Sequence, residues 1–244
     1  MDLTITESDG VRRMGFGTPW CQGAMRIDAP DTLEMEYAVR MSAWLLFQDL
    51  DRLADRHLLT LGLGAGSLTK FALRVLGMRA TAVEIEADVI DACREHFAVP
   101  PDDDRLKVVH GDAAAFVAQP SPGERFDVIQ VDAYDASVDA PALDGKAFYA
   151  DCRASLRPGG VVAVNLIGRE LDVRACVARI RAGLRPRAAW QFPPTEAGNV
   201  VVIAPCGEVP DDGVLAARAL EIDKRWDLPA NGWLAMARRS AGAT

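Results

Sequence analysis

The most constraining feature of this sequence is the alternation of short apolar segments with amphipathic segments through its middle part. The apolar segments are residues 57–63, 79–85, 106–110, 126–131 and 161–166. Helical periodicity follows each of them, and glycine or proline punctuates several of the junctions. This alternation is typical of a parallel sheet covered by helices on both faces. The sequence therefore predicts an α/β fold.

The last part of the chain departs from this pattern. Residues 187–192 and 199–204 indicate two closing strands, which can pair in the antiparallel sense. From Pro210 onward the pattern is helical, over residues 214–222 and 234–239, with a break between these two segments. The tail is therefore expected to add helices to the α/β core.

The beginning of the chain is broken by glycines and has room only for short strands, at residues 3–6 and 24–27. From Asp31 the apolar residues recur at helical spacing, which predicts a helix over residues 31 to about 56. We expect a short N-terminal β element over residues 1–30 and a Rossmann-like nucleoside-binding catalytic domain over residues 31–244.

Composition limits the partners and the location. The net charge is −8 and the arginines are scattered, whereas nucleic-acid binding usually leaves a basic footprint. No apolar run reaches the roughly 18 residues that span a bilayer, and the N-terminus lacks the pattern of a signal peptide. We therefore expect no nucleic-acid partner, no membrane partner and a cytoplasmic location. The cysteines and histidines show no ligand spacing, so no metal is predicted.

The first candidate site motif is a glycine cluster between the first strand of the alternation and the next helix. Gly62, Gly64 and Gly66 would allow a tight turn and a close approach of a ligand to the backbone. Ser67 stands where a dinucleotide fingerprint would carry glycine, which disfavours an NAD dehydrogenase. A nucleoside site is the interpretation that this loop favours.

Acidic residues follow the next two strands. Glu84 lies about 20 residues after Gly62, the spacing at which an acid accepts hydrogen bonds from ribose hydroxyls. The alternative is a solvated carboxylate at a strand end. Asp112 could accept a proton of the adenine amino group, with Ala113 beside the ring, and it could equally cap the following helix.

The fourth motif follows the strand at residues 126–131. Asp132 and Asp135 are three residues apart and could hold an ammonium group and take a proton from it. An amine must lose its proton before it attacks carbon, so a nearby base is needed. Tyr134 could supply an aromatic wall. The alternative is a loop that carries Asx-turns.

Together these motifs resemble the spermidine synthase (polyamine aminopropyltransferase) family. The segments that carry the resemblance are Leu61-Gly62-Leu63-Gly64-Ala65-Gly66, Val83-Glu84-Ile85-Glu86, Gly111-Asp112-Ala113 and the run from Phe126 to Asp135. The resemblance implies a class I AdoMet-methyltransferase-like Rossmann fold with a mostly parallel seven-stranded sheet, and a homodimer. It also implies transfer of an aminopropyl group from decarboxylated AdoMet to a polyamine-type amine.

The resemblance also implies roles for individual residues. Glu84 would bind the ribose and Asp112 the adenine, with Ala113 beside the ring, and Ile85 would belong to the same cofactor-binding set. Asp132 would be the proton acceptor. The acceptor amine would be held by Asp135, Tyr134 and Tyr37, the last of which stands where the family has a Tyr-His-Glu motif.

The chain departs from the family at Ala65, where the family carries an aspartate that holds the ammonium of the donor. This departure keeps two alternatives open. One is an AdoMet-dependent methyltransferase, although Thr60 stands where many such enzymes carry an acid. The other is a non-catalytic nucleoside-binding protein of the same fold.

Overall fold

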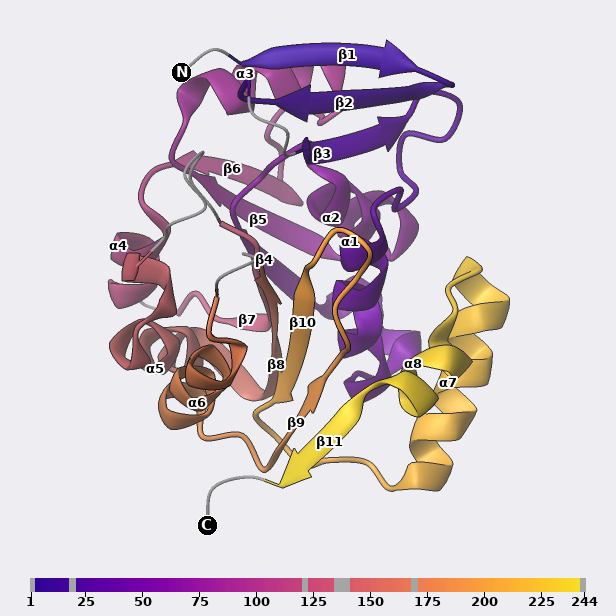
Figure 1. The fold of residues 1–244 in the computed structure, drawn as a ribbon, viewed down its shortest axis with the longest axis vertical. Coiled ribbons are helices and arrows are strands. Elements are labelled where there is room, and N and C mark those ends of the chain that lie inside the picture. The colour runs from indigo at the N-terminus through magenta and orange to yellow at the C-terminus, as the bar shows by residue number, and fades with distance from the viewer. Residues whose placement is uncertain (1–2, 18–20, 120–122, 134–140, 168–170, 242–244) are drawn as a thin grey trace.

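The computed structural model describes residues 3–17, 21–119, 123–133, 141–167 and 171–241, which form two sheets with flanking helices (Figure 1). The strands of the main sheet are β4 (His57–Leu61), β5 (Arg79–Glu84), β6 (Leu106–His110), β7 (Phe126–Val131), β8 (Leu156–Leu166), β9 (Ala188–Gln191), β10 (Val200–Pro205) and β11 (Arg238–Ala241).

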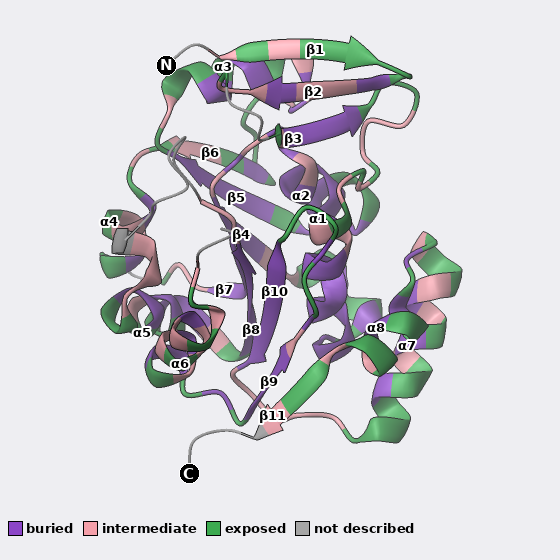
Figure 2. Ribbon diagram, in the orientation of Figure 1, coloured by how far each residue is buried: buried purple, intermediate pink, exposed green. Residues whose placement is uncertain are grey.

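The main sheet has the strand order β11-β9-β10-β8-β7-β4-β5-β6. Strands β4 to β8 are parallel to one another, whereas β10 is antiparallel to both β8 and β9. Strands β7 and β10 are buried at every position, as the colouring of β10 in Figure 2 illustrates. The α/β fold, the mostly parallel sheet and the antiparallel closing strands are thus confirmed.

Helices cover both faces of this sheet (Figure 1). Helices α4 (Ala113–Ala118), α5 (Lys146–Ser155) and α6 (Val173–Leu184) pack on one face. Helices α1 (Glu36–Met41), α7 (Asp212–Trp226) and α8 (Ala230–Met236) pack on the other. Further helical segments are α2 (Ser67–Lys70), its π-helical continuation η3 (Phe71–Val75), α3 (Ala87–His96) and the 3₁₀ segment η4 (Pro141–Asp144).

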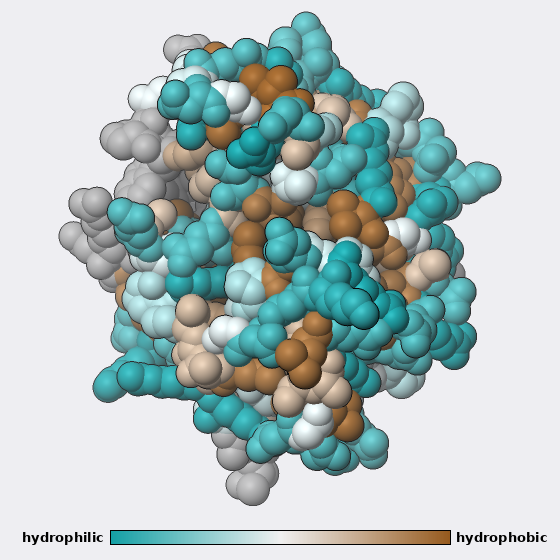
Figure 3. Space-filling model, turned by 90° about the vertical axis from the view of Figure 1, so that its right-hand side faces the viewer, coloured by the Kyte–Doolittle hydropathy of each residue, from teal (hydrophilic) through white to brown (hydrophobic). Residues whose placement is uncertain are grey.

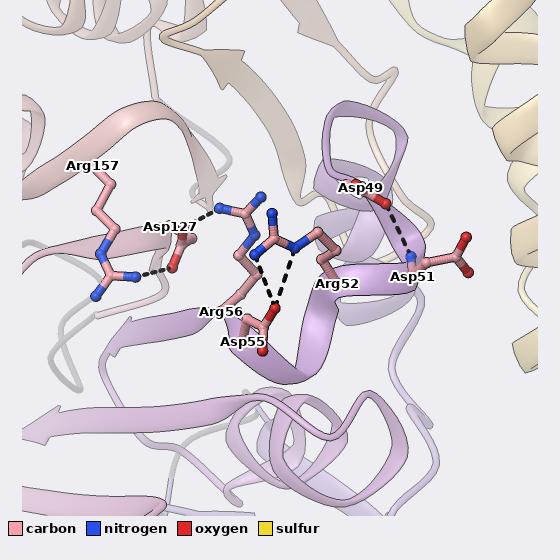
Figure 4. Close-up of polar contacts among 7 residues, drawn as sticks. All are labelled: Asp49, Asp51, Arg52, Asp55, Arg56, Asp127 and Arg157. Carbon is pink, nitrogen blue, oxygen red and sulfur yellow. Dashed lines mark hydrogen bonds and ion pairs between the residues drawn. The ribbon is translucent and has the colours of Figure 1, made fainter.

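The prediction of a single helix over residues 31–56 is wrong. Only α1 is α-helical, and two 3₁₀ segments follow it, η1 (Ser42–Phe47) and η2 (Leu50–Asp55). Every residue of η1 is buried, so the segment lacks the polar face of an amphipathic helix. Asp49 has an extended backbone and accepts a hydrogen bond from the Asp51 N–H, which starts η2 (Figure 4).

The tail also differs from its prediction. Helix α8 ends at Met236, and residues 238–241 form β11 instead of continuing the predicted helix at 234–239. β11 pairs antiparallel with β9 and makes an eighth strand. The Arg239 guanidinium lies 5.2 Å from the centre of the Trp190 ring. Backbone pairing with an open sheet edge and this cation–π contact outweigh a weak local helical preference.

The N-terminal residues form a three-stranded antiparallel sheet. It consists of β1 (Thr4–Ser8), β2 (Val11–Gly15) and β3 (Cys21–Arg26). The predicted strands at 3–6 and 24–27 fall on β1 and β3, whereas β2 was missed. The hairpin between β1 and β2 turns at Asp9 and Gly10, both with positive φ, and Asp-Gly is a strong signal for such a hairpin. A domain boundary at residue 30 stays a prediction.

A buried carboxylate ties the amino ends of the central strands together. The Asp127 side chain on β7 is 2% exposed. It accepts hydrogen bonds from Arg56 (2.9 Å), from Arg157 (3.3 Å) and from the His57 N–H (2.8 Å). Figure 4 shows the aspartate between the two arginines. A buried charge that is paired in this way has a structural role at the edge opposite the candidate site.

None of the helices in the described residues is long and apolar enough to cross a membrane. The surface in Figure 3 shows apolar residues as separate areas interrupted by hydrophilic ones. Large exposed apolar side chains on the C-terminal helices include Val214, Leu220 and Met236.

A buried lysine holds the connection after β3 against the main sheet. The Lys70 ammonium donates to the backbone oxygens of Pro30 (2.6 Å) and Phe97 (2.7 Å) and lies 3.1 Å from the Met25 sulfur. Its side chain is fully buried. Burial lowers the pKa of Lys70 to about 8, since the charged form loses its hydration.

This burial predicts a pH dependence of stability. Between pH 8 and 10.5 the unfolded chain binds a proton at Lys70 that the folded chain has lost, so unfolding becomes less favourable as pH rises. From pH 7.5 to 10, the free energy of unfolding of the wild type should rise by about 2 kcal/mol relative to that of Lys70→Met. Urea denaturation of both proteins measures the difference. A constant difference across this range would contradict the assignment.

Candidate functional site

The glycine loop joins the carboxyl end of β4 to α2 and runs beside the end of β7. The Gly62 N–H donates to the Val83 carbonyl (2.8 Å), and the Asp132 N–H donates to the Leu61 carbonyl (2.8 Å). Gly62 has φ +92°, and a Cβ there would lie 2.3 Å from the Asp132 carbonyl oxygen. Only glycine fits this close approach. Gly64 and Gly66 continue the same loop, as predicted.

The Glu84 carboxylate lies at the base of this loop. It is 9% exposed, and its two oxygens accept hydrogen bonds from the backbone N–H groups of Leu63 (2.8 Å) and Glu86 (3.1 Å). Each carboxylate oxygen has a second acceptor position. Glu84 is therefore oriented by the protein and keeps capacity for a further donor such as a hydroxyl.

The next three predicted residues lie on the same edge of the sheet. Ile85 follows Glu84 directly and is exposed, so its side chain is accessible to a ligand. Asp112 caps α4 by accepting a hydrogen bond from the Ala115 N–H (2.6 Å). Ala113 is buried at the start of that helix. The capping alternative for Asp112 is thus present, and its adenine role stays a prediction.

Asp132 follows β7 and is half-buried. It accepts hydrogen bonds from the Asn165 amide of β8 (2.8 Å) and from the Tyr37 hydroxyl of α1. Burial raises the pKa of Asp132 to about 6, and the charge of Glu84 adds to this, whereas the bonds from Asn165 and Tyr37 oppose it. The structure therefore brings together Tyr37 and Asp132, two predicted site residues. Tyr134 and Asp135 lie outside the described residues.

Sequence reasoning missed the polar side chains behind Asp132. The amide of Asn165 accepts a hydrogen bond from the Asn199 amide (3.1 Å), and Asn199 contacts the Thr195 hydroxyl (3.2 Å). All three side chains are buried. The available signal was Asn165 itself, a lone amide near the carboxyl end of an otherwise apolar strand.

Helix α1 holds the loop between β9 and β10 beside Asp132. Arg40 donates to the Pro193 carbonyl (2.5 Å) and forms an ion pair with Glu36. Glu36 also accepts a hydrogen bond from the Glu196 N–H (3.4 Å). Since Tyr37 is on the same helix, α1 fixes both the loop and a hydrogen bond to Asp132.

Ala65 faces the N-terminal sheet. It is 3% exposed, and a Cβ placed on Gly23 of β3 would lie 2.6 Å from the Ala65 Cβ. The side chain at position 65 is therefore covered by the backbone of β3.

The sheet order and its flanking helices define a class I AdoMet-methyltransferase-like Rossmann fold. Comparison with solved structures supports this class. A probable spermidine synthase from Corynebacterium glutamicum aligns with a TM-score of 0.75 at 20% identity, over 98% of this chain and 87% of that protein. Human methyltransferase-like protein 13, solved in complex with SAH, aligns with a TM-score of 0.63 at 21% identity, over 80% of this chain and 91% of that one.

Sequence comparison finds the same likeness. Residues 52–167, which contain all four motifs, match the spermine/spermidine synthase domain. A polyamine aminopropyltransferase from Neisseria meningitidis is 28% identical over 204 residues, which cover 83% of this chain and 75% of that protein. The chain thus has a segment that matches the spermine/spermidine synthase domain, and it has distant homologues among the polyamine aminopropyltransferases. The resemblance inferred from its motifs is confirmed.

The close approach at Gly62 can be tested with a matched control. Gly62→Ala adds both the strain of positive φ and the contact with Asp132, whereas Gly159→Ala adds only the strain, because nothing lies within 4 Å of a Cβ there. We expect Gly62→Ala to lose about 1–3 kcal/mol more of the free energy of unfolding than Gly159→Ala. Urea denaturation measures both losses, and equal losses would show that the contact with Asp132 is unimportant.

Proposed function

We propose that this protein is an aminopropyltransferase that moves an aminopropyl group from decarboxylated AdoMet to a polyamine-type amine. The observation that carries the proposal is Asp132, a half-buried acid at the end of β7 in a chain with a spermine/spermidine synthase domain. A pKa of about 6 leaves Asp132 mostly ionised at neutral pH. A base whose pKa lies this close to the working pH is suited to accept a proton.

In the proposed reaction Asp132 accepts a proton from the bound ammonium, which frees the lone pair of the amine. The amine nitrogen attacks the methylene carbon bonded to the sulfonium. A C–N bond forms as the C–S bond breaks, and the electron pair of the C–S bond goes to sulfur. Methylthioadenosine leaves as a neutral thioether, so no acid is required. The rate then depends on holding the two reactants in line.

The same proposal assigns the nucleoside contacts. Glu84 would accept hydrogen bonds from the ribose, and its fixed orientation supports this role. Ile85 and Ala113 would contact the adenine, and Asp112 its amino group. The glycine loop would lie against the ligand. Tyr37, Tyr134 and Asp135 would hold the acceptor amine. The homodimer and the cytoplasmic location remain predictions.

One observation favours a second candidate, an AdoMet-dependent methyltransferase. The side chain of Ala65 is covered by β3, so this position offers no charge to the donor ammonium. A charge-assisted hydrogen bond there would be worth about 1.5–3 kcal/mol. Without it, the site has less reason to prefer decarboxylated AdoMet over AdoMet. A non-catalytic nucleoside-binding protein would share this feature.

Calorimetric titration separates the donors. We expect decarboxylated AdoMet to bind at least about tenfold more tightly than AdoMet, a difference of about 1.4 kcal/mol, with methylthioadenosine as the product control. Equal or tighter binding of AdoMet would shift the conclusion to methyl transfer. Binding of a nucleoside without turnover of any amine tested would support the non-catalytic alternative.

Two substitutions test whether proton transfer and nucleoside binding depend on different residues of the site. Asp132→Asn removes the proton acceptor but keeps its shape, so kcat should fall about 10²- to 10⁴-fold with little change in nucleoside affinity. Glu84→Gln should instead weaken nucleoside binding. Steady-state kinetics and calorimetry of both variants measure the two effects. An unchanged rate in Asp132→Asn would rule out its assignment as the base.

A further inference from the structure

The side chains behind Asp132 form a hydrogen-bond chain in which each group donates to the next, toward the carboxylate. The Asn199 N–H donates to the Thr195 hydroxyl oxygen (3.0 Å) and occupies one of its acceptor positions. The hydroxyl hydrogen of Thr195 is donated to the Asn199 amide oxygen (3.2 Å). The NH₂ of Asn199 therefore faces the amide oxygen of Asn165 (3.1 Å), and the NH₂ of Asn165 faces Asp132 (2.8 Å).

Burial keeps this direction. Thr195, Asn199 and Asn165 are 6%, 3% and 3% exposed, so bulk water does not compete for their hydrogen bonds. If one amide turned over, two donors or two acceptors would face each other, and a buried polar group would lose its partner. If both amides turned over together, the Asn165 amide oxygen would face the Asp132 carboxylate, which when ionised can only accept. With an ionised Asp132 the chain therefore has one low-energy arrangement, in which its last member donates to the carboxylate.

The start of the chain is held by the β9–β10 loop. The Thr195 N–H donates to the Asn199 carbonyl (2.8 Å), and the Gly198 N–H donates to the Thr195 carbonyl (2.9 Å). Arg40 of α1 holds the neighbouring Pro193 carbonyl (2.5 Å). This closed turn fixes the position of the hydroxyl at the start of the chain.

We propose that Asn165 and Asn199 are positioning residues, which with Thr195 orient the Asp132 carboxylate and keep it a hydrogen-bond acceptor. The effect on the rate rests on the proposed function of Asp132, whereas the effect on the carboxylate does not. Asn199 acts at a distance, because its contact is with Asn165 and not with the acid. Its role is to determine which end of the Asn165 amide faces Asp132.

The proposal makes a specific statement about the ionisation of Asp132. Among the described residues, the groups that act on this carboxylate include Tyr37 from α1, Asn165 from β8 and Glu84 from β5. Burial and the charge of Glu84 raise its pKa, and the two donors lower it. Loss of the directed donor should therefore raise the pKa of Asp132 further above that of an ordinary aspartate.

The experiment is a titration of the Asp132 carboxyl carbon by NMR in protein labelled at its aspartates, with Asp132→Asn to assign the signal. We expect Asn165→Leu to raise the pKa by about one pH unit. Asn199→Leu and the isosteric Thr195→Val should raise it by a smaller amount in the same direction. Thr81→Val is the matched control, a buried threonine whose hydroxyl contacts His57 instead, and it should leave the pKa unchanged.

The outcomes separate this proposal from the proposed function. If Asn165→Leu raises the pKa but both Asn199→Leu and Thr195→Val leave it unchanged, Asn165 acts alone and the chain is overturned. An unchanged pKa in all three overturns it as well. If the pKa rises and the acidic limb of the rate profile moves with it, both proposals are supported. If the pKa rises while the rate profile stays in place, the chain stands and Asp132 is not the base. Thr195→Val preserves side-chain shape, so the test survives misfolding of a leucine variant.

Discussion

The site depends on the contact between the ends of β4 and β7. These two strands are parallel neighbours at the centre of the sheet, and the chain continues from β4 toward β5 on one side and from β7 toward β8 on the other. Such a reversal of strand order opens a crevice at the carboxyl ends. Gly62 lets the two strand ends approach so closely that its Cα lies against the Asp132 backbone. The glycine loop and the acid are therefore positioned by one backbone contact.

Polar groups gather on the carboxyl side of this contact, and their burial gives Asp132 its properties. An exposed aspartate would stay ionised down to about pH 4, whereas burial and the charge of Glu84 raise the pKa of Asp132 to about 6. Tyr37 and Asn165 keep it oriented while it is held there. At the opposite edge Asp127 is paired with two arginines. Asp127 near the start of β7 thus has a structural environment of paired charges, whereas Asp132, directly after the same strand, lies in the candidate site.

The strand–helix alternation was readable because each segment from β4 to β8 combines strong apolar character with a clear break after it. Residues 31–56 misled the same reasoning, because Trp44, Leu45 and their neighbours are buried on all sides and helical spacing no longer marks one face. The motifs placed Glu84 and Asp132 on one edge of the sheet, since parallel strands end there. Asn199 could not be found in this way. Asn199 precedes β10, and the antiparallel register that pairs Val201 with Asn165 brings the two amides together. A register is not visible in one strand alone.

The two halves of the candidate site differ in what they can distinguish. Asp132 and Glu84 are two carboxylates whose repulsion raises the pKa of Asp132. On the proposed function, a sulfonium ion would be attracted to both of them and would lower that pKa, so its binding would strengthen as pH rises through about 6. This attraction acts on the sulfonium charge, which AdoMet and its decarboxylated form share. It promotes binding of either donor and selects neither. Selection must come from the tail beyond sulfur, and position 65 supplies no charge to it, because it is an alanine whose methyl group is covered by β3. The identity of the donor is therefore decided by contacts other than the acids that make the site recognisable.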